Sequence, residues 1–146
     1  MAQNMVNFAP PLGWFGRIKV EKSGERRGEV DLKKAGIFAI TDGIKALAME
    51  ARRLDGSTHD RMEALVDAGV LKPEQVADLR AAFDFLVRMR LRGQVEALRA
   101  GRKPGNYIAL DQLNAMQQGE LRLAFEGVAS FQSFIQQHFK LQLLRN

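Results

Sequence analysis

Cysteine is absent from this chain of 146 residues, and histidine, tryptophan and tyrosine are rare. Without thiols the chain cannot form disulfide bridges, iron–sulfur clusters or thiolate zinc sites. Its two histidines, His59 and His138, are too few for most histidine-based metal centres, and we expect both at the surface. The sequence therefore predicts no metal and no other cofactor in this chain.

Long hydrophobic runs are also missing. No stretch approaches the roughly 20 apolar residues of a membrane-spanning helix, and the first residues, MAQNMVNFAPP, lack the basic start and apolar run of a signal peptide. There is no GxxxxGK phosphate loop, and no serine is placed with a histidine and an acid as a nucleophile. We expect a cytoplasmic protein with no membrane partner.

Positive charge is in excess but is not clustered. Lys and Arg number 22 against 17 Asp and Glu, which gives a net charge of +5. Phosphate backbones favour clustered cations, whereas acidic residues interrupt the basic ones almost everywhere here and no nucleic-acid-binding motif is present. A small basic nucleic-acid-binding protein is therefore the least favoured of three functional interpretations.

Hydrophobic periodicity indicates an all-α fold. With 46% hydrophobic residues, the chain can bury one core. Apolar residues at helical spacing, together with capping residues such as Ser57 and Asp60 and the early proline Pro73, predict an antiparallel bundle of four to five helices. Helices are expected at about 31–54, 57–69, 73–100 and 117–144, with Asp31 capping the first and Asp111 capping a short turn.

The start of the chain differs in composition from the rest. Glycine-rich turns predict a short β-hairpin with strands Arg17–Lys22 and Glu29–Leu32. A lone two-stranded ribbon is marginal in water, so we expect it to pack on the helices, anchored by Trp14 and Phe15, or to belong to a neighbouring module. This gives two regions, an extension of residues 1–30 and a bundle domain of residues 31–146.

Arg90 lies on the apolar stripe of the longest expected helix. At about 100° per residue, that stripe contains Leu79, Phe83, Leu86, Arg90, Gln94 and Ala97. The other arginines of this helix, Arg88, Arg92 and Arg99, point to the opposite side, where water solvates them. An unpaired guanidinium facing the core is costly, so Arg90 needs a carboxylate and carbonyl partners or an anionic ligand.

Other polar side chains share core-facing positions with Arg90. Lys33 lies on the side of the isoleucines of the first helix, Arg61 lies on the apolar face of the second, and Gln94 follows Arg90 by one turn. Asp31 is the nearest acidic candidate to balance them. Two interpretations stay open: a buried hydrogen-bonded network that fixes helix register, or a pocket that binds phosphate or carboxylate.

The last helix carries two apolar faces. Leu123, Phe134 and Leu141 line the reverse of its main stripe, with small residues between them. Two faces require two contacts, so the helix either lies centrally in its own bundle or docks a partner domain or a second copy of the chain. A structural module of a signal-transduction protein, used for homodimerisation or domain docking, is the second functional interpretation.

Four segments carry a family resemblance. VDLKKAGI, STHDRMEAL, LRAAFDFLVRMRLRGQ and AGRKPGNYI resemble successive motifs of the helical C-terminal domain of bacterial putative nucleotidyltransferases, over roughly Pro11 to Phe139. In that family the domain is described as substrate-binding, and it follows a catalytic nucleotidyltransferase domain that is often preceded by CBS-pair and cyclic-nucleotide-binding modules. Position by position, the resemblance singles out Asp31, Lys33, Thr58, Arg61, Arg90, Gln94 and Asn106.

The resemblance also shows what this chain lacks. The related catalytic domains use a Gly-Ser turn and two aspartates separated by one residue to hold metal ions. Here Gly56-Ser57 leads into an expected helix cap, and no Asp-x-Asp pair follows it. We expect a chain that is not catalytic by itself, and that is the C-terminal part of a longer protein or the companion of a separate catalytic chain. A Mg-nucleotide is implied only for that partner domain.

The favoured hypothesis is a substrate-binding or regulatory domain of a nucleotidyltransferase, with an anion-recognising site in the bundle. In it, Arg90 contacts a small anionic ligand with support from Gln94, and Asn106 donates a hydrogen bond from its loop. The remaining expected ligand-binding residues are Lys33 and Arg61 as flanking cations and Asp31 as the orienting carboxylate.

Overall fold

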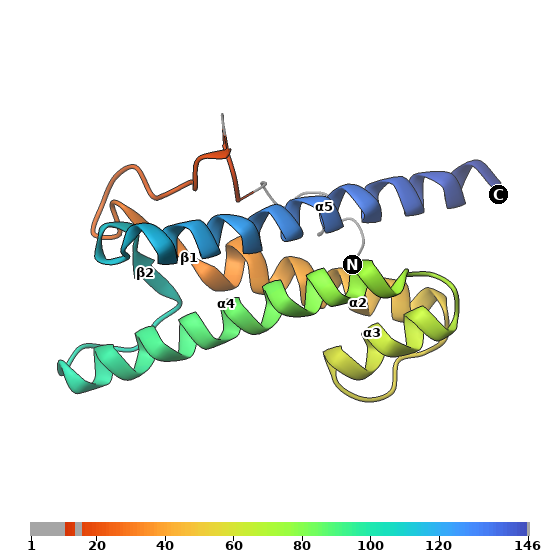
Figure 1. The fold of residues 1–146 in the computed structure, drawn as a ribbon, viewed down its shortest axis with the longest axis horizontal. Coiled ribbons are helices and arrows are strands. Elements are labelled where there is room, and N and C mark those ends of the chain that lie inside the picture. Colours follow the sequence, from red (N-terminus) through yellow and green to blue (C-terminus); the bar gives the residue numbers. More distant parts are fainter. Residues whose placement is uncertain (1–10, 14–15, 146) are drawn as a thin grey trace.

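The all-α fold expected from the sequence is confirmed by the computed structural model, which describes residues 11–13 and 16–145 (Figure 1). The proposed anchors Trp14 and Phe15 lie outside the described residues. The described elements, in chain order, are β1 (Glu29–Asp31), the π-helical turn η2 (Lys33–Ile37), α2 (Phe38–Glu50), α3 (Thr58–Asp67), α4 (Pro73–Arg99), β2 (Tyr107–Ala109), the 3₁₀ turn η3 (Leu110–Gln112) and α5 (Ala115–Arg145).

The three long helices enclose the core: α5 packs along both α4 and α2, and α4 meets the turn η2 that precedes α2. Helix α4 runs antiparallel to both α2 and α5, the short α3 covers one end of the bundle, and the strands β1 and β2 lie at the other end (Figure 1). The side chains with the least solvent exposure come from all three long helices and include Ile40, Ile44, Leu47, Leu86, Leu121, Phe125, Val128 and Ile135.

Strand β1 pairs with β2, which the local sequence pattern did not predict. The pairing is antiparallel, with Val30 opposite Ile108 and Asp31 opposite Tyr107. Residues 17–22 do not form the regular partner strand that was expected, but Glu21 exchanges backbone hydrogen bonds of 3.0 and 2.8 Å with Glu29 and Gly28, so this segment does turn back beside β1. The pairing with β2 buries Val30 against the core, and this burial supplies the support that an isolated ribbon lacks.

The first helical segment begins directly after Asp31, as expected, but its first turn is π-helical and it ends earlier than expected. Asp31 belongs to β1, yet its Oδ1 accepts the backbone N–H of Lys34 at 3.0 Å, which is the hydrogen bond of a cap. The backbone then forms the π-helical turn η2, where Gly36 lies so close to α4 that a Cβ there would be 2.6 Å from Leu86 Cδ1. Helix α2 ends at Glu50, and Arg52 takes a positive φ of 59°.

The boundaries of α3 and α4 that rest on capping residues are confirmed, whereas the expected cap Asp111 is wrong, because Asp111 lies inside η3 and Ala109 precedes that turn. Ser57 and Asp60 form the reciprocal capping box of α3, and Pro73 occupies the first turn of α4. Gly101, with a φ of +71°, ends α4 directly after Ala100. These signals depend on a few neighbouring residues, so they can be read without knowledge of the tertiary structure.

In the described part of the chain, none of the helices combines the length and apolar content that a bilayer crossing would need.

The capping box makes a testable prediction about acid stability. The backbone N–H of Ser57, and then its hydroxyl, lower the pKa of Asp60 below the usual 3.8. Because the pKa of Asp60 is lower in the folded protein than in the unfolded chain, its carboxylate stabilises the fold at pH values above the ordinary pKa of the group. This stabilisation is lost as the pH falls through the pKa that Asp60 has in the folded protein. In urea titrations, the advantage of the wild type over Asp60→Asn should therefore shrink between about pH 5 and about pH 2.5.

The matched control is Asp67→Asn, an exposed carboxylate at the last residue of the same helix. Its stability difference from the wild type should change less over this pH range. A constant difference between the wild type and Asp60→Asn would contradict the assignment.

Candidate functional site

Arg90 contacts the loop that precedes β2. Its Nε donates to Asn106 Oδ1 at 2.6 Å, and both side chains are partly buried. The neighbouring arginines Arg88, Arg92 and Arg99 are exposed, as expected. Arg90 therefore differs from them in its surroundings, but its partner is a neutral amide rather than the carboxylate that the sequence suggested.

Asn106 connects Arg90 to both strands. Its backbone carbonyl accepts the N–H of Leu32 at 2.9 Å, directly after β1, while its side chain holds α4. Close packing supports the same junction, because a Cβ on Gly93 would be 3.4 Å from Ile108 Cγ2. The structure thus brings Asp31, Arg90 and Asn106 to one end of the bundle, and the Arg90–Asn106 bond joins α4 to the small sheet.

Gln94 lies on the same side of α4, one turn beyond Arg90, and is partly buried. This position agrees with the expected stripe, which continues to the buried Ala97. Gln94 is thus positioned beside the junction, as its spacing from Arg90 predicted.

Lys33 and Arg61 do not join this junction. Lys33 Nζ lies over the Phe38 ring, 4.8 Å from its centroid, whereas Arg61 Nε donates to the carbonyl of Leu54 at 2.9 Å. Lys33 precedes the start of α2 and Leu54 follows its end, and a helix of 13 residues is about 20 Å long. The expectation of three cations in one pocket is therefore wrong. Helical periodicity shows which face of its helix a residue lies on, but it does not show at which end of the bundle that residue lies.

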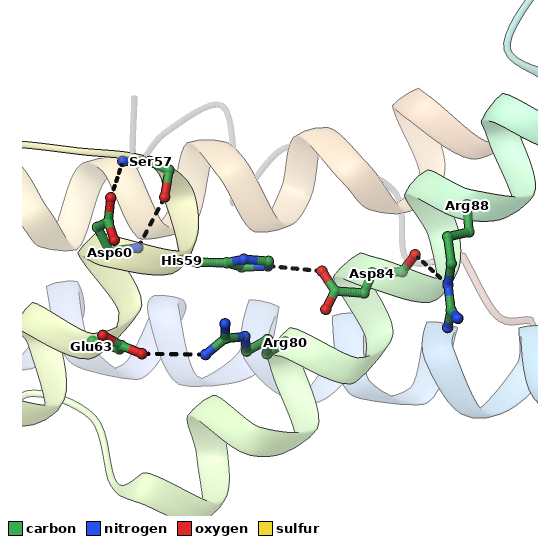
Figure 2. Close-up of polar contacts among 7 residues, drawn as sticks. All are labelled: Ser57, His59, Asp60, Glu63, Arg80, Asp84 and Arg88. Carbon is green, nitrogen blue, oxygen red and sulfur yellow. Dashed lines mark hydrogen bonds and ion pairs between the residues drawn. The ribbon is translucent and has the colours of Figure 1, made fainter.

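Polar residues of α3 instead bind α4 at the opposite end from the strands. Figure 2 shows His59 pointing at Asp84, with 2.8 Å between Nε2 and Oδ1, and Glu63 paired with Arg80 at 3.3 Å. Thr58 is the first residue of α3, beside the capping box, and is partly buried. This part of the resemblance set therefore lies where α3 is held to the bundle.

Both histidines are partly exposed, which agrees with the expected surface positions, but each also makes a contact with another helix that the sequence did not predict. The His59 side chain is 33% exposed and also packs edge-on against Phe83, at 5.7 Å between ring centroids. The His138 side chain is 20% exposed and its Nε2 lies 2.5 Å from Glu50 Oε1, which joins α5 to α2. Each histidine pairs with a carboxylate of another helix, a contact that local sequence cannot reveal.

A groove opens beside the Arg90–Asn106 junction, between the C-terminal half of α4, β2 and the start of α5. Its volume is about 820 Å³. We call it the basic groove, because five cationic side chains line it against three acidic ones: Arg26, Arg88, Arg92, Arg102 and Lys103 against Glu29, Glu96 and Glu120.

Only some of these charges are paired with one another. Arg26 lies 3.3 Å from Glu29 and over the Tyr107 ring at 4.7 Å, and Arg92 lies 3.9 Å from Glu96. Burial, and then nearby acidic groups including Asp31, raise the pKa of Tyr107 above its usual 10.

Sequence reasoning missed this groove. Arg88 and Arg92 are exposed, as their helical spacing predicts. The exposed side on which they lie also faces the groove. The available signal was their spacing of four residues, followed after the helix by Arg102 and Lys103. Recognising it requires knowing that the loop folds back along α4.

The second apolar face of α5 is only partly exposed. Leu123 and Leu141 are 67% and 53% exposed. Phe134 is partly buried and stacks between the rings of Phe131 and His138, at centroid distances of 6.5 and 5.8 Å. Of the three expected interface residues, two are available at the surface and one packs mainly within its own helix.

Among the residues with a described position, no three His, Asp or Glu side chains lie together in a group that could hold a metal ion. The basic groove, with arginine, lysine and amide side chains, is suited to oxyanions rather than to cations.

Comparison with known proteins identifies the class. The chain belongs to the family described as "Putative nucleotidyltransferase substrate binding domain", which it matches over residues 1–139. The family implies association with a nucleotidyltransferase domain. No curated protein and no solved structure matches the chain.

The Arg90–Asn106 contact yields a prediction about stability. Asn106→Ala leaves a partly buried guanidinium without its acceptor, so the free energy of unfolding should fall by about 1–3 kcal/mol. Arg90→Met keeps the apolar stem and removes the charge. Urea unfolding of both single variants and of the double variant should give a coupling energy of about 1 kcal/mol or more.

Arg99→Met serves as the control, because Arg99 is an exposed arginine of the same helix. Combined with Asn106→Ala, it should show additive effects. If the stability losses of Arg90→Met and Asn106→Ala were also additive, the proposed contact between the two side chains would be contradicted.

Proposed function

We propose that this chain binds the anionic substrate of a nucleotidyltransferase in the basic groove and presents it to a catalytic domain. One observation carries the proposal: cationic side chains from three separate segments converge on one groove of substrate size. Arg26 precedes β1, Arg88 and Arg92 come from α4, and Arg102 and Lys103 come from the loop after α4. Ligand sites for small molecules typically measure 300–1,000 Å³, and the groove lies in this range at about 820 Å³.

The charge balance of the groove favours an anion. Within the described residues, Arg88, Arg102 and Lys103 form no ion pair, so their charges are available to a ligand. Arg88 Nε does bond the Asp84 carbonyl at 3.3 Å, which leaves the rest of its guanidinium free to bind an oxyanion (Figure 2). Guanidinium groups bind phosphate and carboxylate through two parallel hydrogen bonds, and lysine adds a point charge.

In this proposal Arg90 supports the site instead of contacting the ligand. Its hydrogen bond to Asn106 holds the loop against α4 and so fixes Arg102 and Lys103 along the groove. A neutral amide accepts the bond, so the positive charge of Arg90 is not cancelled and adds to the potential at this end. Asp31 and Gln94 belong to the same support, whereas Lys33 and Arg61 lie outside it.

Nucleotidyl transfer itself is assigned to the partner domain. A magnesium-bound nucleotide would be held by that domain, where the metal would supply charge neutralisation. The role of this chain is to bind and orient the acceptor, which lowers the entropic cost of bringing two substrates together.

Calorimetric titration of the full chain with pyrophosphate and with AMP tests the proposal. Arg88→Gln should weaken binding about tenfold, because it removes an available charge from the groove. The matched control Arg99→Gln removes an exposed arginine from the same helix but outside the groove, and should leave the affinity unchanged. Equal losses in the two variants would indicate unspecific attraction to a basic protein and would contradict the proposal, as would no binding of either anion.

A further inference from the structure

A second hollow continues the basic groove along α4 and α5. Its volume is about 640 Å³, and it lies between the N-terminal half of α4 and the middle of α5. We call it the apolar trough. Buried apolar side chains form its floor, namely Leu71, Leu79, Ala82, Ala124 and Phe131. Leu123, which is 67% exposed, stands at its rim.

Small residues keep the trough open where the two helices approach. Gly127 of α5 lies opposite Ala82 of α4, and a Cβ at Gly127 would be 3.4 Å from the Ala82 Cβ. Ser130, one turn further along α5, is exposed and also lines the trough. Larger side chains at these positions would fill the space between the helices.

The two hollows meet at shared residues. Phe85, Arg88 and Glu120 line both the basic groove and the apolar trough. Arg88 thus lies where cationic lining gives way to apolar lining. A ligand held by Arg88 in the groove has an apolar surface directly next to its binding group.

From this continuity we infer that the ligand is an amphiphilic organic anion, with a phosphate or carboxylate group in the basic groove and an apolar group in the trough. The inference rests on the proposed function and adds the class of substrate. The orientation follows from charge, because the acidic Asp78 and Glu126 border the trough and would repel an anionic group there. It also gives Leu123 a role as part of the trough wall instead of a protein interface.

A series of alkyl phosphates tests the inference. Affinities of methyl, butyl, hexyl and octyl phosphate for the full chain are measured by calorimetry below their micelle concentrations. Because a fully buried methylene contributes about fourfold in affinity and the trough is partly open, we expect about twofold per methylene. Octanol, which lacks the anionic group, should bind far more weakly than octyl phosphate.

Matched variants locate the apolar group. Ser130→Leu fills the trough and should remove the dependence on chain length while leaving methyl phosphate affinity unchanged. Ser133→Leu adds the same side chain at an exposed position of α5 that does not line the trough. It should change neither the dependence of affinity on chain length nor the affinity for methyl phosphate. Leu123→Ala shortens the side chain at the rim and should lower the affinity for octyl phosphate about twofold to threefold. Thermal stability equal to that of the wild type would confirm that each variant folds.

The outcomes separate this inference from the proposed function. Equal affinities across the series, with binding retained, would overturn the amphiphilic ligand and leave the anion site intact. No binding of any phosphate would overturn both. A chain-length dependence that survives Ser130→Leu would place the apolar group elsewhere and would also overturn the inference.

Discussion

The hydrogen bond from Arg90 to the Asn106 side chain determines the shape of one end of this bundle. A partly buried guanidinium is stable only if its N–H groups find acceptors, and the Asn106 amide supplies one at 2.6 Å. The backbone carbonyl of the same asparagine bonds to Leu32. One loop residue thereby joins α4 to β1 and β2, and this junction keeps the loop after α4 folded back along its own helix.

Use of an amide instead of a carboxylate has an electrostatic consequence. Asparagine accepts the hydrogen bond but brings no negative charge, so the charge of Arg90 still contributes to the potential around it. The ion pairs of the basic groove neutralise only Arg26 and Arg92. Cationic side chains outside ion pairs thus gather where β2, α4 and the start of α5 meet, while the α3 end is held by contacts such as His59 with Asp84 and Glu63 with Arg80.

Sequence reasoning succeeded where the controlling interactions are local. The capping box at Ser57, the proline at the start of α4 and the glycine at its end each depend on a few adjacent residues, and they fixed the helix boundaries. Helical periodicity also identified Arg90 as unusual. It could not give the pairing of Val30 with Ile108 or the separation of Arg61 from Arg90, because both depend on which distant segments pack together.

Anion binding in the basic groove is tested most directly by NMR. Backbone amide and arginine Nε–H resonances of the full chain, followed by NMR during titration with AMP, would map the bound ligand onto the structure. We expect the largest shifts at Arg88, Arg102 and Tyr107, with little change at Arg61 and His59. Shifts centred on the α3 end, or none at saturating AMP, would contradict it.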